Sequence, residues 1–517
     1  MPEPSDPQQP PISENYARYA LGVLVLVYVF NFLDRQILSI LAEDIKADLG
    51  LGDAEIGFLY GTAFAVFYAI FGIPLGRLAD AWTRRTVISL GMALWSLMTA
   101  ASGFATSFRY LAVARIGVGI GEASASPSAF SLLSDYFPPE RRATVMAIYS
   151  SGLYVGAGIG LFLGGWIVDS WNGAWPTGNA PLGLKGWQAA FMIVGLPGLL
   201  MALWVRTLRE PPRSGEAESD GSKAEDPWGV FRSELAMVMP GFTLVTLSRA
   251  GAGSRGIMVN LAAAAGLVAT AAGLTSQLGD AIQWYALAIG IYATFSWVQN
   301  LALTDPSTFE MIFRGRTLRS AVVGFSLMAF SSYSVGFWVV PYFLRTFDLS
   351  VSEVGTSLGL ISAVGGWLGA TVGGFTADAW RKRARLGRLN FCVVSAVLPM
   401  PFVALLVRTD QLAVAYAMAF LAQVSSGIWL GAAISTVQDL VAPRMRAVAG
   451  AIYILMMTFV GLALGPYSIG KASEVTGDLG FAIQLALIAN ALAIPFFLTA
   501  RRHLVADEDR VTAALEV

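Results

Sequence analysis

Cysteine, histidine and charged residues are scarce in this 517-residue chain. The single cysteine, Cys392, excludes an internal disulfide. The single histidine, His503, follows two arginines near the C-terminus, so we expect neither a histidine-based catalytic site nor a metal site. Charged residues make up 13% of the chain, whereas about one quarter is usual in soluble domains. The net charge of -1 comes without a basic block, so no nucleic-acid partner is expected.

Hydrophobic residues make up 55% of the chain and form successive apolar runs. Because about 20 apolar residues cross a bilayer as a helix, the pattern predicts an all-α polytopic membrane protein. We expect about 14 spans, at residues 17–43, 55–79, 85–106, 109–134, 142–169, 188–207, 256–276, 281–303, 317–345, 351–378, 389–408, 411–439, 445–470 and 479–500.

Basic residues favour the cytoplasmic side of a membrane. With the N-terminus inside, most of the 34 Lys and Arg residues fall in cytoplasmic segments. This predicts a multi-pass protein of the inner (plasma) membrane with both termini cytoplasmic. The bases expected outside are Lys46, Arg109, Lys185, Arg345, Arg408 and Lys471.

The same pattern divides the chain into segments. In the linker, Trp228, Phe231, Leu235 and Val238 recur at helical spacing, which indicates a short helix along the inner membrane face. The pair 256–303 is read as two inserted spans, although 256–276 is also compatible with a surface-lying segment. The predicted segments are a disordered tail (1–16), a six-helix bundle (17–207), a cytoplasmic linker (208–255), the inserted pair (256–303), a second six-helix bundle (317–500) and a C-terminal tail (501–517).

Two patterns occur twice. Residues 79–85 match 377–383, and the residues from Asp135 to Tyr149 share a spacing with those from Asp439 to Tyr453. Both pairs lie at predicted cytoplasmic helix ends, so the halves run in the same direction, as parallel repeats do.

The stretch 76–85 (GRLADAWTRR) resembles the loop motif between helices 2 and 3 of the major facilitator superfamily. Within that superfamily, residues 31–35 (NFLDR), 115–123 (RIGVGIGEA) and 134–143 (SDYFPPERRA) resemble the spinster-like transporters. The resemblance implies a major facilitator fold of two six-helix bundles that works by alternating access. The family usually has twelve helices, so the inserted pair is a departure from it. Spinster relatives are associated with lysophospholipids and sphingoid phosphates.

Four charged residues lie well inside predicted spans, away from the span ends: Asp34 and Arg35 in the first, Arg115 and Glu122 in the fourth. An ionisable group at membrane depth normally faces a polar interior and has a partner. Arg115 and Glu122 are two turns apart on one helix face. If the two spans border one cavity, as the resemblance implies, one network holds all four. We expect Asp34 and Glu122 to couple protons, and Arg35, Arg115 and Asn31 to bind an anionic headgroup. A static ion-pair lock is the alternative.

The second half offers polar and aromatic residues in place of charges. Tyr333, Ser334, Gln423 and Trp429 are expected to bind substrate, with plain helix packing as the alternative. A cytoplasmic gate is predicted from the charges of the repeated loops, although basic loops also serve topology alone. Its members are Asp80, Arg84, Arg85, Arg142, Asp378 and Arg446.

Six glycines crowd the fifth span, where small residues let helices approach closely. Static packing and a sliding contact between the halves are both consistent with the pattern. They are Gly152, Gly156, Gly158, Gly160, Gly164 and Gly165.

These observations predict a secondary active transporter, proton-coupled, that moves an amphipathic or anionic small molecule resembling a lysolipid or sphingolipid. Na⁺ is an open alternative to H⁺. A small-organic-anion or drug antiporter on the same scaffold is the second interpretation, and a non-transporting receptor the third. We expect no enzymatic activity and no cofactor. The expected partners are the lipid bilayer, the small-molecule substrate and protons, and the protein is expected to be a monomer.

Overall fold

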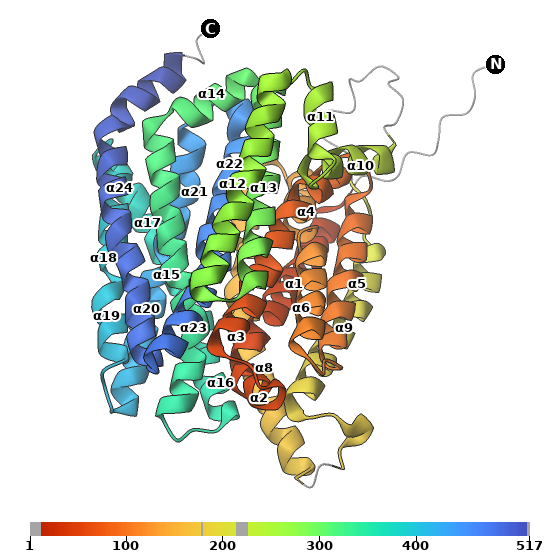
Figure 1. Cartoon of the computed structure of the whole chain (residues 1–517), viewed down its shortest axis with the longest axis vertical. Coiled ribbons are helices and arrows are strands. Elements are labelled where there is room, and N and C mark those ends of the chain that lie inside the picture. Colours follow the sequence, from red (N-terminus) through yellow and green to blue (C-terminus); the bar gives the residue numbers. More distant parts are fainter. Residues whose placement is uncertain (1–11, 177–178, 213–225, 514–517) are drawn as a thin grey trace, which may run out of the picture.

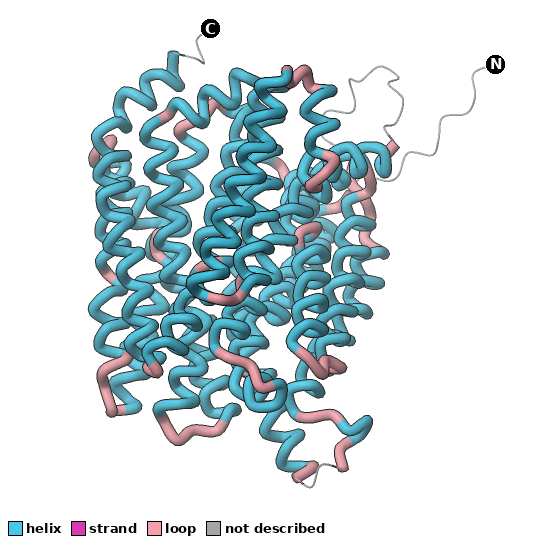
Figure 2. Tube along the Cα trace, viewed as in Figure 1, coloured by secondary structure: helices cyan, strands magenta, loops and turns pink. Residues whose placement is uncertain are grey.

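The computed structural model describes residues 12–176, 179–212 and 226–513, and within these ranges every regular element is a helix (Figures 1 and 2). Most helices run along one axis (Figure 1). The start of α1 and the end of α24 lie at the same end of the bundle, which we call the terminal end. The opposite end, where α2, α3 and α16 lie, is the distal end.

The first half of the chain forms one bundle. Ser13 caps its first helix, because its hydroxyl accepts the backbone N–H of Tyr16. The helices of this half are α1 (Glu14–Ile40), α2 (Ala42–Leu49), α3 (Asp53–Tyr60), α4 (Thr62–Ala81), α5 (Arg84–Ser102), α6 (Phe108–Glu122), α7 (Ala125–Tyr136), α8 (Pro139–Ala174) and α9 (Gly186–Arg206).

The second half forms the other bundle, and two of its helices contain a π-helical turn, a feature often found at functional sites. These turns are η3 (Ile361–Gly365) and η5 (Met457–Ala463). The helices are α15 (Arg316–Thr346), α16 (Val351–Leu360), α17 (Gly366–Arg383), α18 (Gly387–Val397), α19 (Pro399–Leu406), α20 (Leu412–Gly427), α21 (Leu430–Asp439), α22 (Arg446–Met456), α23 (Gly465–Thr476) and α24 (Leu479–Ala513).

Between the halves, α12 (Ser254–Leu278) and α13 (Ala281–Thr304) form a hairpin that runs parallel to the bundle helices (Figure 1). Two short helices, α10 (Pro227–Val238) and α11 (Thr243–Arg249), precede it and meet at an angle of 106°. The short helix predicted in the linker is therefore α10, which packs against α4. A further short helix, α14 (Pro306–Arg314), leads into the second half.

Helices occupy all the predicted spans, as expected for the major facilitator fold with an inserted pair. In the described ranges, 12 helices are long and apolar enough to cross a membrane, and α12 and α13 are among them. Two predicted spans, α5 and the α6–α7 pair, are not among these 12 helices. α5 begins with two arginines and is rich in Ser and Thr, and α6 stops at Glu122. Both pack inside the first half, α5 against α6 and α9, and α6 against α4.

Some boundaries differ from the prediction. The first span ends at Ile40, and a separate helix, α2, follows. Residues 501–513, predicted as a tail, continue α24. This extension is tied to the second half, because Asp507 accepts the backbone N–H of Thr317 (2.7 Å) and Glu508 accepts a hydrogen bond from Arg381 (2.6 Å). Residues 1–11 of the predicted N-terminal tail and 213–225 of the linker lie outside the described residues.

The glycines of α8 serve two contacts. One set faces α1 within the first half: a Cβ on Gly156 would lie 2.3 Å from the carbonyl oxygen of Val29. The other set faces α16 across the two halves: a Cβ on Gly158 would lie 2.5 Å from the carbonyl oxygen of Gly359. Because both faces are packed this closely, α8 is fixed to α1 and at the same time forms the boundary with the second half.

Candidate functional site

The buried charges of α1 and α6 meet inside the first half. Arg35 donates to Glu122 over 2.6 Å, and the side chains are 8% and 0% exposed. Nη1 of Arg115 reaches the backbone carbonyl oxygen of Asp34 at 3.4 Å. Thus the closest ion pair joins Arg35 to Glu122. All four residues are buried, and so is Asn31, one turn before Arg35 on α1.

Aromatic rings of α4 complete this cluster. The Arg35 guanidinium lies 4.3 Å from the centre of the Phe64 ring, and that of Arg115 lies 5.8 Å from it. Helix α4 reaches this position because α6 has Gly119 there, whose Cβ would lie 2.5 Å from the carbonyl oxygen of Phe64. Tyr68, one turn further along α4, also faces Arg35, at 5.6 Å. Cation–π contacts stabilise a desolvated guanidinium by roughly 2 kcal/mol.

Several polar atoms of the cluster have no hydrogen-bond partner among the described residues. They include both carboxylate oxygens of Asp34, one oxygen of Glu122, and Nε and Nη2 of Arg115. Leaving a buried charged group without partners is costly. The carboxylate oxygens are suited to binding a proton, and the guanidinium N–H groups are suited to donating to a water or a ligand.

The four binding residues predicted in the second half have different surroundings. Gln423 lines a small hollow with a cavity volume of about 40 Å³, together with Ser332 and Ser426. Tyr333 packs against two hydrophobic clusters, a large one that extends over both halves and a smaller one within the second half.

The remaining two lie in helix packing. The ring of Trp429 stacks on Phe325 at 5.9 Å, and the Ser334 hydroxyl donates to the carbonyl oxygen of Phe330. The structure therefore brings Gln423 to a cavity and places Trp429 and Ser334 among packed side chains.

The predicted gate residues of the first half lie at the terminal end. Arg84 binds Asp135 and Glu210, the latter at 2.8 Å, and Arg85 donates to the carbonyl oxygen of Leu208. Asp80 is largely exposed and pairs with Arg77 at 3.6 Å. In the described part of the chain, Asp80 therefore forms no ion pair with Arg84 or Arg85.

The second half repeats one of these contacts. Arg388 binds Asp439 (2.5 Å) and Asp378 (3.3 Å). Arg84 lies at the start of α5 and Arg388 at the start of α18, which are the third membrane spans of the two halves. Each arginine binds an aspartate at the end of the fourth span, in α7 or in α21. The repeat therefore includes an ion pair that sequence comparison missed, because the loops before the two arginines differ in length.

Arg142 and Arg446 bind no acid in this arrangement of the described residues. Arg142 donates to the carbonyl oxygen of Phe137 and Arg446 to that of Gln438, each at 3.3 Å. None of these terminal-end contacts joins the two halves, and the gating role of the six residues remains a prediction.

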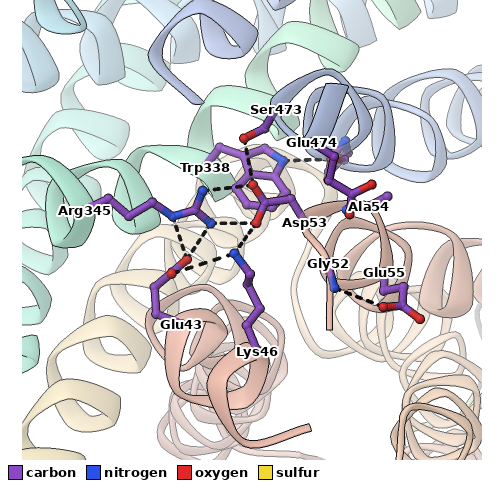
Figure 3. Close-up of polar contacts among 11 residues, drawn as sticks. Glu43, Lys46, Gly52, Asp53, Ala54, Glu55, Trp338, Arg345, Ser473 and Glu474 are labelled. Carbon is purple, nitrogen blue, oxygen red and sulfur yellow. Dashed lines mark hydrogen bonds and ion pairs between the residues drawn. The ribbon is translucent and has the colours of Figure 1, made fainter. Parts of the chain in front are cut away.

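A cluster at the distal end, which sequence reasoning missed, joins the two halves (Figure 3). Asp53, at the start of α3, is 5% exposed and accepts two hydrogen bonds from Arg345 of α15, at 2.9 and 2.7 Å. It also accepts from Ser473 of α23 at 2.7 Å and from Lys46 of α2. Arg345 further pairs with Glu43 at 2.6 Å. We call Glu43, Lys46, Asp53, Arg345 and Ser473 the distal latch.

Further bonds join the halves at this end. Ser39 donates to the carbonyl oxygen of Phe337 at 2.7 Å, and the backbone N–H of Ala54 donates to Glu474 at 2.9 Å. The sequence did contain a signal for these contacts, because basic residues are rare on the predicted outer side and the few present there need acidic partners. Of the six, the four that form ion pairs here are Lys46, Lys185, Arg345 and Lys471.

Comparison with known proteins identifies the fold. A sequence profile of the Major Facilitator Superfamily matches residues 24–466. The chain belongs to the Major Facilitator Superfamily. Its members are membrane transporters, so this chain is a multi-pass membrane transporter of a small molecule.

Relatives within the superfamily include spinster proteins. The chain is 28% identical over 464 residues to an "MFS-type efflux pump" of Mycolicibacterium smegmatis (strain ATCC 700084 / mc(2)155), covering 89% of this chain and 86% of that protein. It is 22% identical over 519 residues to the "Sphingosine-1-phosphate transporter SPNS2" of Danio rerio, covering 95% and 85%. A solved bacterial homologue of the human lysosomal transporter Spinster, inward-facing and unoccupied, has a TM-score of 0.71 and 25% identity, covering 96% of this chain and 99% of that one.

Proposed function

We propose that this transporter is a proton-coupled secondary carrier that moves an amphipathic or anionic small molecule by alternating access. The observation that carries the proposal is the buried cluster of Asp34, Arg35, Arg115 and Glu122, in which the Asp34 carboxylate lacks a hydrogen-bond partner among the described residues. Buried ionisable groups of this kind in membrane proteins commonly mark a path for protons or substrate.

The chemistry follows from the Arg35–Glu122 pair. While Glu122 is ionised, it holds Arg35 at 2.6 Å. Protonation of Glu122 removes that charge and leaves the guanidinium free to bind an anionic group of the substrate. Asp34 and Arg115 supply a second buried acid and base, whose side chains are not paired with each other within the described ranges. Proton transfer between the two acids then couples substrate binding to the gradient.

The hollow in the second half supports an amphipathic substrate. Its walls are mostly apolar, with Val335, Val339 and Leu358 beside Gln423 and Ser332. Ligand pockets commonly combine apolar walls with a few polar groups in this way. The hollow is small, at about 40 Å³, so it must widen as the halves move before an apolar chain can enter it. A molecule with its anionic end at Arg35 and its apolar end against these walls would then contact both halves. The relative named as a sphingosine-1-phosphate transporter is consistent with such a substrate.

The conformation follows from orientation. We place both termini in the cytoplasm and the protein in the inner (plasma) membrane, because the bases concentrate at the terminal end. The distal latch is then external, and the chain is closed to the outside.

The second candidate is an antiporter of small organic anions or drugs on the same scaffold. The relative named as an efflux pump favours it, since it matches over 89% of this chain. The same arginines would bind the anion, but the substrate would not need the apolar hollow.

Proteoliposomes with an imposed pH gradient test the proposal. Candidate lysolipids and organic anions are first selected by thermal shift, and a true ligand should lose its shift in Arg35→Ala and Arg115→Ala. Gradient-driven uptake of that ligand should then disappear in Asp34→Asn and Glu122→Gln. Asp348→Asn, which neutralises an exposed acid, is the matched control and should transport normally. Normal gradient-driven uptake by both variants would refute the assignment of the two acids.

A further inference from the structure

The inserted hairpin is held together by a buried polar network. Asn260 of α12, which is 0% exposed, donates to Ser296 and Gln299 of α13 at 3.0 Å each and accepts from Tyr292 at 2.7 Å. Gln299 donates to the backbone carbonyl of Gly256 at 2.7 Å. Because every polar group of this amide side chain has a partner from α13, the two helices form one unit.

This unit lies along the seam between the halves. α13 packs against α4 of the first half and η5 of the second. Gly290 sits between them: its Cβ would lie 2.4 Å from Phe459 of η5 and 3.1 Å from Val66 of α4. The Thr62 hydroxyl of α4 lies 2.6 Å from Gln283 of the hairpin. A change in the relative position of the halves must therefore alter the contacts of α13.

The tip of the hairpin contacts the second half at the distal end. Asp280, between α12 and α13, lies 2.8 Å from Nζ of Lys471 and accepts from the Tyr467 hydroxyl at 3.0 Å. Its backbone is left-handed, with φ of 55°, which is uncommon for a residue other than glycine. Lys471 also lies 3.7 Å from Glu474, the acceptor for the N–H of Ala54 beside the distal latch.

The rest of the hairpin unit is attached to the first half. α10, which leads into it, pairs Glu234 with Arg77 of α4 at 3.3 Å, and Trp228 packs on Trp82 at 5.7 Å between ring centres. The unit is thus joined to the first half by α10 and along α13. It meets the second half through the apolar contact of Gly290 with Phe459 and through the charged contact at its tip.

We propose that the hairpin is a clasp: it moves with the first half, and Asp280 holds Lys471 only while the distal end is closed. The inference rests on the proposed alternating access of the halves. The closed state gains the Asp280–Lys471 and Asp280–Tyr467 contacts, and the distal-open state loses them. The inserted pair therefore biases the carrier toward the state with the distal end closed.

Spin-label distance measurements on the full chain in nanodiscs test the clasp. Labels are placed at Thr106→Cys and Gln411→Cys, in distal loops of the two halves, with Cys392→Ala to remove the native thiol. Asp280→Asn keeps the side-chain size and tolerates the left-handed backbone. It should raise the ratio of distal-open to distal-closed molecules about three- to tenfold, as expected for a hydrogen-bonded, partly exposed ion pair.

Two further variants decide the cause. Lys471→Gln should give the same shift, and the double variant should add little, because both remove one interaction. Lys185→Gln breaks an ion pair with Asp48 at the same end but within the first half, and should change nothing.

Unchanged ratios in Asp280→Asn and Lys471→Gln would overturn the clasp. A single label-to-label distance in all variants would also overturn the clasp, because no distal-open state would then exist for the hairpin to disfavour. The measurement needs no substrate or gradient. A chain that opens and closes but transports nothing would refute the proposed function and leave the clasp standing.

Discussion

Asp53→Asn is the most direct test of how the halves are held together. Asp53 is 5% exposed and accepts three hydrogen bonds from the second half, two from Arg345 and one from Ser473. Hydrogen bonds to a charged group contribute about 1.5–3 kcal/mol. The amide retains one acceptor oxygen, and Arg345 retains Glu43. We therefore expect the distal-closed state to lose about 2–3 kcal/mol relative to the open one.

That loss corresponds to a change of roughly 30- to 150-fold in the ratio of open to closed molecules, since about 1.4 kcal/mol is a factor of ten. The labels at positions 106 and 411 report this ratio as two distances. Glu55→Gln is the control, because Glu55 lies on the same helix and accepts only the N–H of Gly52 within its own half. Equal distance distributions in Asp53→Asn and the unsubstituted chain would contradict the reasoning.

Three further predictions concern stability. Asn260→Leu should lower the melting temperature in detergent by a few degrees, because polar contacts between membrane helices contribute about 0.6–2 kcal/mol; an unchanged melting curve would contradict the network. Gly156→Leu should give little monodisperse protein by size-exclusion chromatography, because its Cβ would lie 2.3 Å from a carbonyl oxygen, whereas Gly22→Leu, with no neighbour within 4 Å of a Cβ, should behave normally. Burial, followed by nearby carboxylates, raises the pKa of Asp44 above its ordinary value. Its ionisation therefore destabilises the fold as pH rises through that pKa, so Asp44→Asn should raise the melting temperature by about 1–2 °C at pH 8, and less at pH 4.

The charges inside the apolar runs could be read as a buried cluster from the sequence alone, because membrane helices turn ionisable side chains inward. The particular pairing could not. Arg115 and Glu122 are two turns apart on one helix, and the partner that reaches Glu122 is Arg35 from α1. The rotation of α1 and α6 about their axes decides which side chains meet, and only the packing of the whole bundle fixes that rotation.

The gate residues show the limit of sequence motifs. The repeat identified Asp135 and Asp439 as equivalent, and each binds an arginine at the start of the third helix of its half. Asp80 is in the motif too, but it lies exposed beside Arg77. Neighbours in sequence are therefore poor guides to ion pairs at helix ends, where the chain changes direction.

The sequence by itself determined the helical membrane architecture, the two parallel halves and the inserted pair, because apolar length and repeated loops are local properties of the chain. Only the tertiary structure decided what joins the halves. The distal latch takes Asp53 from one half and Arg345 and Ser473 from the other, and the hairpin reaches Lys471 through Asp280. These contacts link residues far apart in the chain, so they exist only once packing has fixed the two bundles against each other.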